Sequence, residues 1–141
     1  MALLKDKDRE KLTELLKTLP EAVTLVMFTQ EMECQYCEMT RKLLEEVTAL
    51  SDRLTLEVYD FVKDKDAVSS HGIDKVPATI VMGDRDYGVR FYGVPSGYEF
   101  TTLIQDVMDA GRRSPGLSEN ILSGLRDVDR PVHLQVIISP T

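Results

Sequence analysis

The sequence Val23-Thr24-Leu25-Val26-Met27-Phe28 is followed by Glu33-Cys34-Gln35-Tyr36-Cys37, and these two stretches decide the fold. The first is short, almost continuously apolar and rich in β-branched side chains, which predicts a buried strand. In residues 54–61 apolar and polar side chains alternate, which predicts a second strand. Between them, apolar residues recur at helical spacing, at Met39, Leu43, Leu44, Val47 and Leu50. A strand, a helix and a strand in this order predict a parallel βαβ unit with a right-handed crossover.

Further helices and a hairpin are predicted on either side of this unit. Leucines spaced three, four and seven residues apart predict a helix that ends before Pro20; they are Leu12, Leu15, Leu16 and Leu19. A short helix is predicted around 64–70. The β-rich runs 78–82 and 89–92 are joined by a short segment of turn residues, which predicts an antiparallel hairpin.

The next helix is predicted to open with a capping box. Ser96-Gly97-Tyr98-Glu99 has the S-x-x-E pattern of that motif, and we expect Gly111 to close the helix. Apolar residues follow the box at helical spacing, at Phe100, Leu103, Ile104, Val107 and Met108. Parallel strands and a hairpin with flanking helices predict an α/β fold with a central mixed β-sheet.

The composition excludes several classes of protein. A chain of 141 residues, 43% of them hydrophobic, can bury a core without disulfide bonds. Its net charge of −7 gives no general attraction for nucleic acid or for an anionic membrane surface. Charged residues follow Met1–Leu4 at once, and no window approaches the ~20 apolar residues of a transmembrane helix. We therefore expect a cytoplasmic protein that binds neither nucleic acid nor a membrane.

The two cysteines form one Cys-x-x-Cys pair where the predicted strand gives way to the helix. In the cytoplasm such pairs are more often catalytic or metal-binding than structural. Residues i and i+3 of a helical turn hold their Cβ atoms ~5–6 Å apart, so a disulfide can form with little backbone movement. A ring this short removes little entropy from the unfolded chain, which favours a redox role.

The position of the pair predicts different roles for its two sulfurs. A helix N-terminus stabilises a thiolate, so we expect Cys34 to be the nucleophile and Cys37 the buried, resolving thiol. Three acidic residues, Glu31, Glu33 and Glu38, surround the site. A carboxylate at ~7 Å opposes a thiolate by ~0.6 kcal/mol, comparable with the ~0.3–1 kcal/mol from the helix end. We therefore expect a Cys34 pKa only mildly below that of a free cysteine, and a reducing couple.

Other roles for the pair stay open on these grounds. Free cysteines are often buried in cores, although the neighbouring Glu33, Gln35 and Glu38 are polar. A zinc or iron–sulfur site needs further ligands, and the two histidines, His71 and His133, stand far along the chain. A cluster shared between two chains is a third alternative. We expect no metal and no cofactor within the chain.

Three motifs together resemble the thioredoxin superfamily: CQYC at 34–37, KVPATIV at 75–81 and YGVPSGYEF at 92–100. The chain is most similar to glutaredoxin-like protein disulfide oxidoreductases, which carry two thioredoxin-like units in tandem. The resemblance covers residues 21–111 and implies a thioredoxin-like fold.

The resemblance also implies roles for single residues. In that family the proline is cis and the residue before it pairs its backbone with the substrate peptide, roles that fall on Pro77 and Val76. The residues between the cysteines tune the redox potential, here Gln35 and Tyr36, and with Val76 and Pro77 they are the expected substrate-binding set. Thioredoxins proper have Gly-Pro there and a buried Asp before the site. Apolar Met27 stands near the place of that Asp, so no proton acceptor is identified.

The C-terminal residues predict that the chain contains the start of a second unit. The run 132–138 repeats the pattern of 23–29, so we expect it to be the first strand of a second unit. The predicted domains are therefore residues 1–113, with the thioredoxin-like fold, and 114–141, a linker helix with the start of a truncated unit. We expect strand 132–138 to pair with a sheet edge, its own or that of a second copy in a dimer.

These features predict an enzyme, a dithiol–disulfide oxidoreductase. It would act on protein disulfides or pass electrons between a flavin-dependent reductase and a client such as a peroxidase. The alternative is a non-catalytic thioredoxin-like module that docks redox partners.

Overall fold

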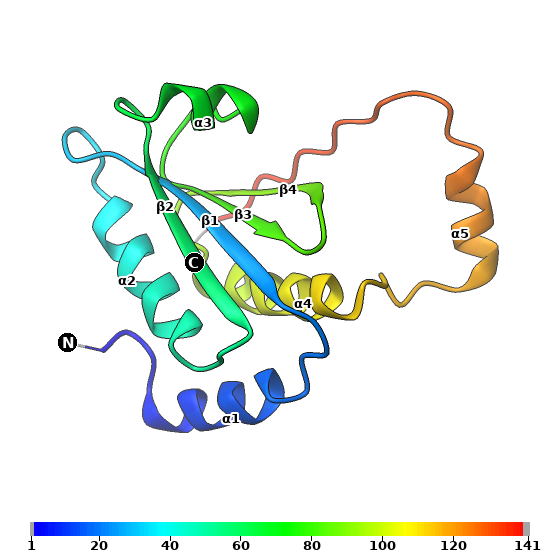
Figure 1. Cartoon of the computed structure of the whole chain (residues 1–141), viewed down its shortest axis with the longest axis horizontal. Helices are drawn as coiled ribbons and strands as arrows, with labels where there is room; N and C mark the ends of the chain where they lie inside the picture. Colours follow the sequence, from blue (N-terminus) through cyan, green and yellow to red (C-terminus); the bar gives the residue numbers. More distant parts are fainter. Residues whose placement is uncertain (1, 140–141) are drawn as a thin grey trace.

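The computed structural model describes residues 2–139, so Met1, Pro140 and Thr141 of the two predicted domains lie outside the described residues. Its helices and strands follow one another along the chain as shown in Figure 1. They are α1 (Asp6–Leu16), β1 (Val23–Thr29), α2 (Cys37–Thr48), β2 (Leu54–Asp60), α3 (Lys65–Ser70), β3 (Ala78–Met82), β4 (Asp86–Tyr92), α4 (Tyr98–Arg112) and α5 (Glu119–Arg126).

The four strands form one mixed sheet in the order β2-β1-β3-β4. β1 and β2 are parallel, whereas β3 is antiparallel to both β1 and β4, so the predicted βαβ unit and hairpin are both confirmed. Phe28 pairs with Ala78, which in turn pairs with Tyr92. The ends of β1 and β4 and the start of β3 therefore meet at one edge of the sheet. We name this the cysteine edge, because the chain passes from it directly to Cys34.

Both faces of the sheet are buried, which explains the continuous apolar run of β1. Alternate residues of β1, among them Leu25 and Met27, belong to a large core with α1, α2 and α4. Val26 and Phe28 point the other way, into a smaller core with Ile80 and the α3 region. Figure 1 shows α1, α2 and α4 on one side of the sheet and α3 on the other. We name the side with α1, α2 and α4 the helix face.

Both predicted ends of α4 are wrong. The helix begins after Gly97, whose φ of +61° turns the chain, and no side chain caps it, so Ser96 does not form a capping box. Gly111 does not close the helix, which continues to Arg112 and ends at Arg113 in a left-handed conformation. Gly111 is instead a packing residue, since a Cβ there would lie 2.4 Å from Cδ1 of Leu19.

The buried face of α2 is rotated from the predicted one by one residue at its start. Met39 is 47% exposed, whereas the neighbouring Thr40 is fully buried. The reason is local: Thr40 uses its hydroxyl to bond the carbonyl of Tyr36, 2.8 Å away, and so can be buried with its polar group paired.

The C-terminal segment differs most from the prediction. Residues 132–138 form no strand and pair with no strand of the described sheet, so the expected pairing with the chain's own edge is wrong. A strand forms only where a neighbour exchanges backbone hydrogen bonds with it, and the sheet β2-β1-β3-β4 includes no strand from this segment. Exposure of 83–88% at Leu134, Val136 and Ile137 agrees with this. Within residues 2–139 no helix is long and apolar enough to cross a membrane.

Candidate active site

The two cysteines lie at the start of α2 and form a disulfide bond, with their Cα atoms 5.5 Å apart. Cys37 is the first residue of the helix and is only 2% exposed, whereas Cys34 in the preceding loop is half-buried. The backbone N–H and the hydroxyl of Thr40 both donate to the carbonyl of Tyr36, which fixes the first turn. Cys34 is therefore the more exposed residue of the pair.

The N-terminus of α2 is free of a side-chain cap, since its N-cap residue Tyr36 makes no capping hydrogen bond. The unpaired N–H groups and the dipole of the helix therefore favour a negative sulfur at this end. Two of the nearby acids are paired with lysines at 2.8 Å, Glu38 with Lys42 and Glu31 with Lys63. The hydrogen bond and the charge of Lys42 lower the pKa of Glu38. Because each of these carboxylates is paired with a lysine, its electrostatic repulsion of a Cys34 thiolate is weaker.

The two residues between the cysteines face solvent. Tyr36 is 49% exposed and Gln35 is exposed as well. Glu33, directly before Cys34, has a φ of 57°, a left-handed conformation that is uncommon for a residue with a side chain. Gln35, Tyr36 and the half-buried Cys34 are thus open, in whole or in part, to an approaching molecule.

The peptide bond between Val76 and Pro77 is cis, as predicted. Pro77 is buried and its carbonyl accepts the N–H of Gly93 at 2.9 Å, while Val76 is half-buried. Both residues directly precede β3, so they lie at the cysteine edge, where β1 leads into the Cys34 loop. The structure therefore brings the predicted residues to one edge of the sheet.

The interior behind the cysteines holds two polar residues that sequence reasoning missed. Met27 is fully buried, as its place in an apolar run suggested. Among the described residues, the buried polar side chains are those of Thr40 and Thr79. Thr79 pairs in register with Met27, a relation that no sequence pattern reveals before the strand register is known.

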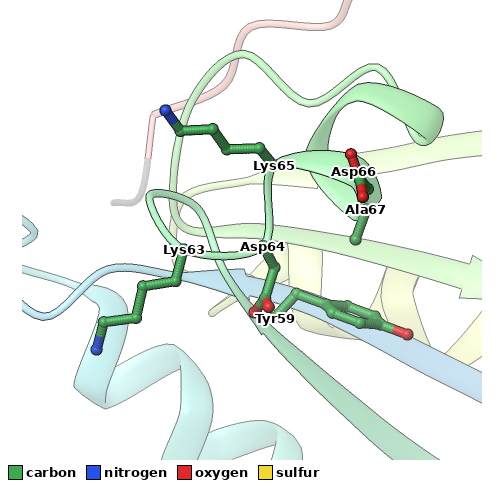
Figure 2. Close-up of a pocket in the computed structure, with 6 residues that line it drawn as sticks. All are labelled: Tyr59, Lys63, Asp64, Lys65, Asp66 and Ala67. Atoms are coloured by element: carbon green, nitrogen blue, oxygen red, sulfur yellow. The ribbon is translucent and has the colours of Figure 1, made fainter.

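A hollow of about 390 Å³ lies beside α3 (Figure 2), and neither cysteine lines it. Its lining is mostly charged: Tyr59, Lys63, Asp64, Lys65, Asp66 and Ala67. Lys63 at its rim bonds Glu31 of the cysteine loop, which ties the two loops together. No three His, Cys, Asp or Glu side chains in the described part of the chain are grouped to hold a metal ion.

Comparison with known sequences identifies the domain. The family described as "Thioredoxin domain" matches residues 25–105. A protein of Staphylococcus aureus (strain NCTC 8325 / PS 47) that is named as an alkyl hydroperoxide reductase subunit is 26% identical over 102 residues, 72% of this chain and 18% of its own length. A protein named NADH dehydrogenase of Ferdinandcohnia aciditolerans is 24% identical over 98 residues, 69% of this chain and 17% of its own length. The chain thus spans less than a fifth of the length of these relatives.

Solved structures agree with this assignment. A protein disulfide oxidoreductase from Aeropyrum pernix superimposes with a TM-score of 0.81 at 25% identity, over 91% of this chain and 56% of that one. The alkyl hydroperoxide reductase protein AhpF of Enterococcus faecalis shows the same fold, with a TM-score of 0.77 at 22% identity, over 86% and 59% of the two chains. Since the family match covers more than half of the residues, the chain belongs to the thioredoxin-domain family, within the thioredoxin superfamily.

Proposed function

We propose that this chain is a thiol–disulfide oxidoreductase that acts on protein disulfides. One observation carries the proposal: the Cys34–Cys37 disulfide joins a half-buried cysteine to a buried one at an uncapped helix N-terminus. This arrangement fits an attacking and a resolving thiol.

The reaction begins with the reduced pair. The Cys34 thiolate attacks one sulfur of the target disulfide, forms a mixed disulfide and releases the other target sulfur as a thiolate. The Cys37 thiolate then attacks the Cys34 sulfur, which forms the Cys34–Cys37 disulfide and releases the second target thiolate. Two electrons pass to the target, and its two thiolates take up the two protons that the cysteine pair gave up.

The surroundings of the pair supply the contacts for the target. Gln35 and Tyr36 are exposed beside Cys34, and the backbone of Val76 lies before the cis-proline at the same edge of the sheet. We assign substrate binding to these residues and Pro77. An extended target peptide beside Val76 would add backbone hydrogen bonds to the side-chain contacts.

The relatives favour particular partners. Several similar proteins are named as alkyl hydroperoxide reductase subunits, so we propose a flavin-dependent reductase and a peroxidase as electron donor and client of this chain. A cytoplasmic location remains a prediction from the sequence.

Insulin reduction with dithiothreitol as the electron source tests the function. We expect turnover by the native chain, none by Cys34→Ser, and accumulation of a mixed disulfide with insulin by Cys37→Ser. Turnover that survives Cys34→Ser would contradict the assignment of the nucleophile. Absence of turnover in the native chain would favour the docking module instead.

A further inference from the structure

Thr79 has the only buried side-chain N or O atom without a hydrogen-bond partner within residues 2–139. The residue is fully buried in β3, two positions after cis-Pro77. Buried hydroxyl groups in native proteins are nearly always paired, and an exception calls for a reason such as a redox role.

The hydroxyl lies on the helix face of the sheet. Side chains alternate along a strand, and Val81, two residues beyond Thr79, belongs to the core shared with α2 and α4. The register partner of Thr79 is Met27, which belongs to the same core. Thr79 is therefore directed toward the helices and not toward α3.

Cys37 lies on the same face and at the same end of the sheet. The buried side of α2 carries Cys37, Thr40 and Leu44, and Leu44 packs into the core that holds Met27. Because α2 begins where the chain leaves β1, its first residue lies at the cysteine edge. β3 also begins at that edge, with Thr79 as its second residue.

When the disulfide opens, the Cys37 thiolate needs a hydrogen-bond donor, and the side chains of Met27 and Thr40 do not supply one. The resolving step needs Cys37 as a thiolate, and burial alone raises the pKa of a thiol. The Met27 side chain has no hydrogen-bond donor, and the hydroxyl of Thr40 already donates to the carbonyl of Tyr36. Thr79 has the remaining unpaired hydroxyl in this part of the core, with one proton to donate.

We propose that Thr79 is the positioning residue for the resolving thiol, its hydroxyl donating a hydrogen bond to the Cys37 sulfur when the disulfide opens. A hydrogen bond to the charged form of a group favours that form, so Thr79 lowers the pKa of Cys37 and stabilises the reduced pair. In the disulfide state the hydroxyl has no partner, which favours reduction further. This role rests on the proposed function and deepens it.

The variants Thr79→Val and Thr79→Ser test the proposal, because the first replaces the hydroxyl with a methyl group of similar size and the second retains it. The full chain is equilibrated with glutathione, where two glutathione thiols and the protein disulfide exchange with glutathione disulfide and the protein dithiol. We expect Thr79→Val to shift this equilibrium about fivefold to tenfold toward the protein disulfide. Tenfold corresponds to a potential about 30 mV more negative. Thr79→Ser stays near the native value.

A second readout separates the hydroxyl from general packing. In a Cys34→Ser background, the pH dependence of Cys37 alkylation shifts upward with Thr79→Val and not with Thr79→Ser. Equal potentials and equal alkylation profiles for a folded Thr79→Val and the native chain would overturn the proposal. The titration needs no protein substrate, so the role of Thr79 can fail while insulin reduction succeeds, and the reverse.

Discussion

The charges beside Cys34 decide how reactive its thiol is. Glu33 has no lysine in an ion pair among the described residues, unlike Glu31 and Glu38, so its charge acts on Cys34 without local compensation. Glu33→Gln removes a repulsion of ~0.6 kcal/mol, and alkylation of Cys34 by iodoacetamide at pH 7 should become about threefold faster.

Glu45→Gln is the matched control, because Glu45 lies two turns along α2 from the cysteines and pairs with Arg41. At that separation the charge is largely screened at physiological salt, so the alkylation rate should not change. Equal rates for Glu33→Gln and the native chain would show that the acids do not set the reactivity of Cys34.

Glu46 fastens the N-terminal segment to α2. Its carboxylate accepts the N–H groups of Leu3 at 2.6 Å and Leu4 at 3.0 Å and pairs with Arg9 at 3.2 Å. The two backbone hydrogen bonds, with the charge of Arg9, hold the pKa of Glu46 below its usual value. We expect Glu46→Gln to lower the free energy of unfolding at pH 7 by roughly 1–2 kcal/mol, measured by urea denaturation.

The pH dependence follows from the direction of that shift. Because the folded pKa of Glu46 lies below the unfolded one, the stabilisation is fully present above pH ~4.3 and is lost as the pH falls through the folded pKa. The difference between the native chain and Glu46→Gln should therefore shrink below pH ~4. A difference that persists at acid pH would mean that the carboxylate charge is not its source.

The sequence predicts only those site residues whose role follows from residue type and spacing. The disulfide of Cys34 and Cys37 could be predicted because a Cys-x-x-Cys pair acts locally, and the cis bond before Pro77 because the motif around it resembles that of a known family. Thr79 could not, because its importance comes from the register that places it opposite Met27. Thr40 was missed for a related reason, since its burial depends on a hydrogen bond to the carbonyl of Tyr36.

Two helical glycines differ in what surrounds them. At Gly111 in α4 a new Cβ would meet Leu19 Cδ1 at 2.4 Å and Leu19 Cγ at 2.9 Å, whereas at Gly124 in α5 nothing lies within 4 Å. Gly111→Ala should lower the free energy of unfolding by ~1–3 kcal/mol through overpacking. Gly124→Ala should not lower it, because alanine favours a helix by ~1 kcal/mol over glycine. Denaturant titration of the two variants measures both free energies of unfolding. An equal change in the two variants would contradict this account.

The ends of helices and strands were predicted best where the pattern of apolar and polar residues within the element determines them. The apolar run of β1 and the alternation in β2 set those strands to within a residue. The ends of α4 failed because they depend on backbone conformations, a φ of +61° at Gly97 and +56° at Arg113, that the capping pattern did not reveal. β4 also starts three residues earlier than its β-rich run, because Asp86 pairs in register with Met82 of β3 beyond a register shift between Ile80 and Met82.

The thioredoxin domain should fold without the C-terminal residues. None of residues 115–139 is buried. The free energy of unfolding of a chain that ends at Ser114 should therefore lie within ~0.5 kcal/mol of that of the full chain, and the shorter chain should reduce insulin equally well. Denaturant titration and the insulin assay check this. A loss of more than ~2 kcal/mol would show that the boundary near residue 113 is wrong.

The exposed tail predicts how the protein associates. Aliphatic residues that are about half or more exposed run from α5 to the end of the described chain: Ile121, Leu125, Val128, Val132, Leu134, Val136, Ile137 and Ile138. Exposed apolar segments of this kind promote association. We expect the full chain to form dimers through 132–138 in analytical ultracentrifugation and the chain ending at Ser114 to be monomeric. Monomers in both would contradict the dimer.

The fold of residues 21–111 could be predicted because each of its strands has a partner within the chain. The segment 132–138 resembles β1 in sequence but finds no such partner, and the same pattern therefore gives no strand. Sequence periodicity indicates which residues can form a strand, whereas the neighbours decide whether the strand forms.

The central claim is that Cys34 and Cys37 form a reversible redox couple. Equilibration of the full chain in glutathione buffers of graded composition, with the dithiol quantified by alkylation and mass spectrometry, tests it most directly. The account predicts one two-electron transition with a potential between about −200 and −300 mV, the range of reducing thioredoxin-like proteins. A pair that stays oxidised below about −300 mV, as structural disulfides do, or that is already reduced near −120 mV would contradict it.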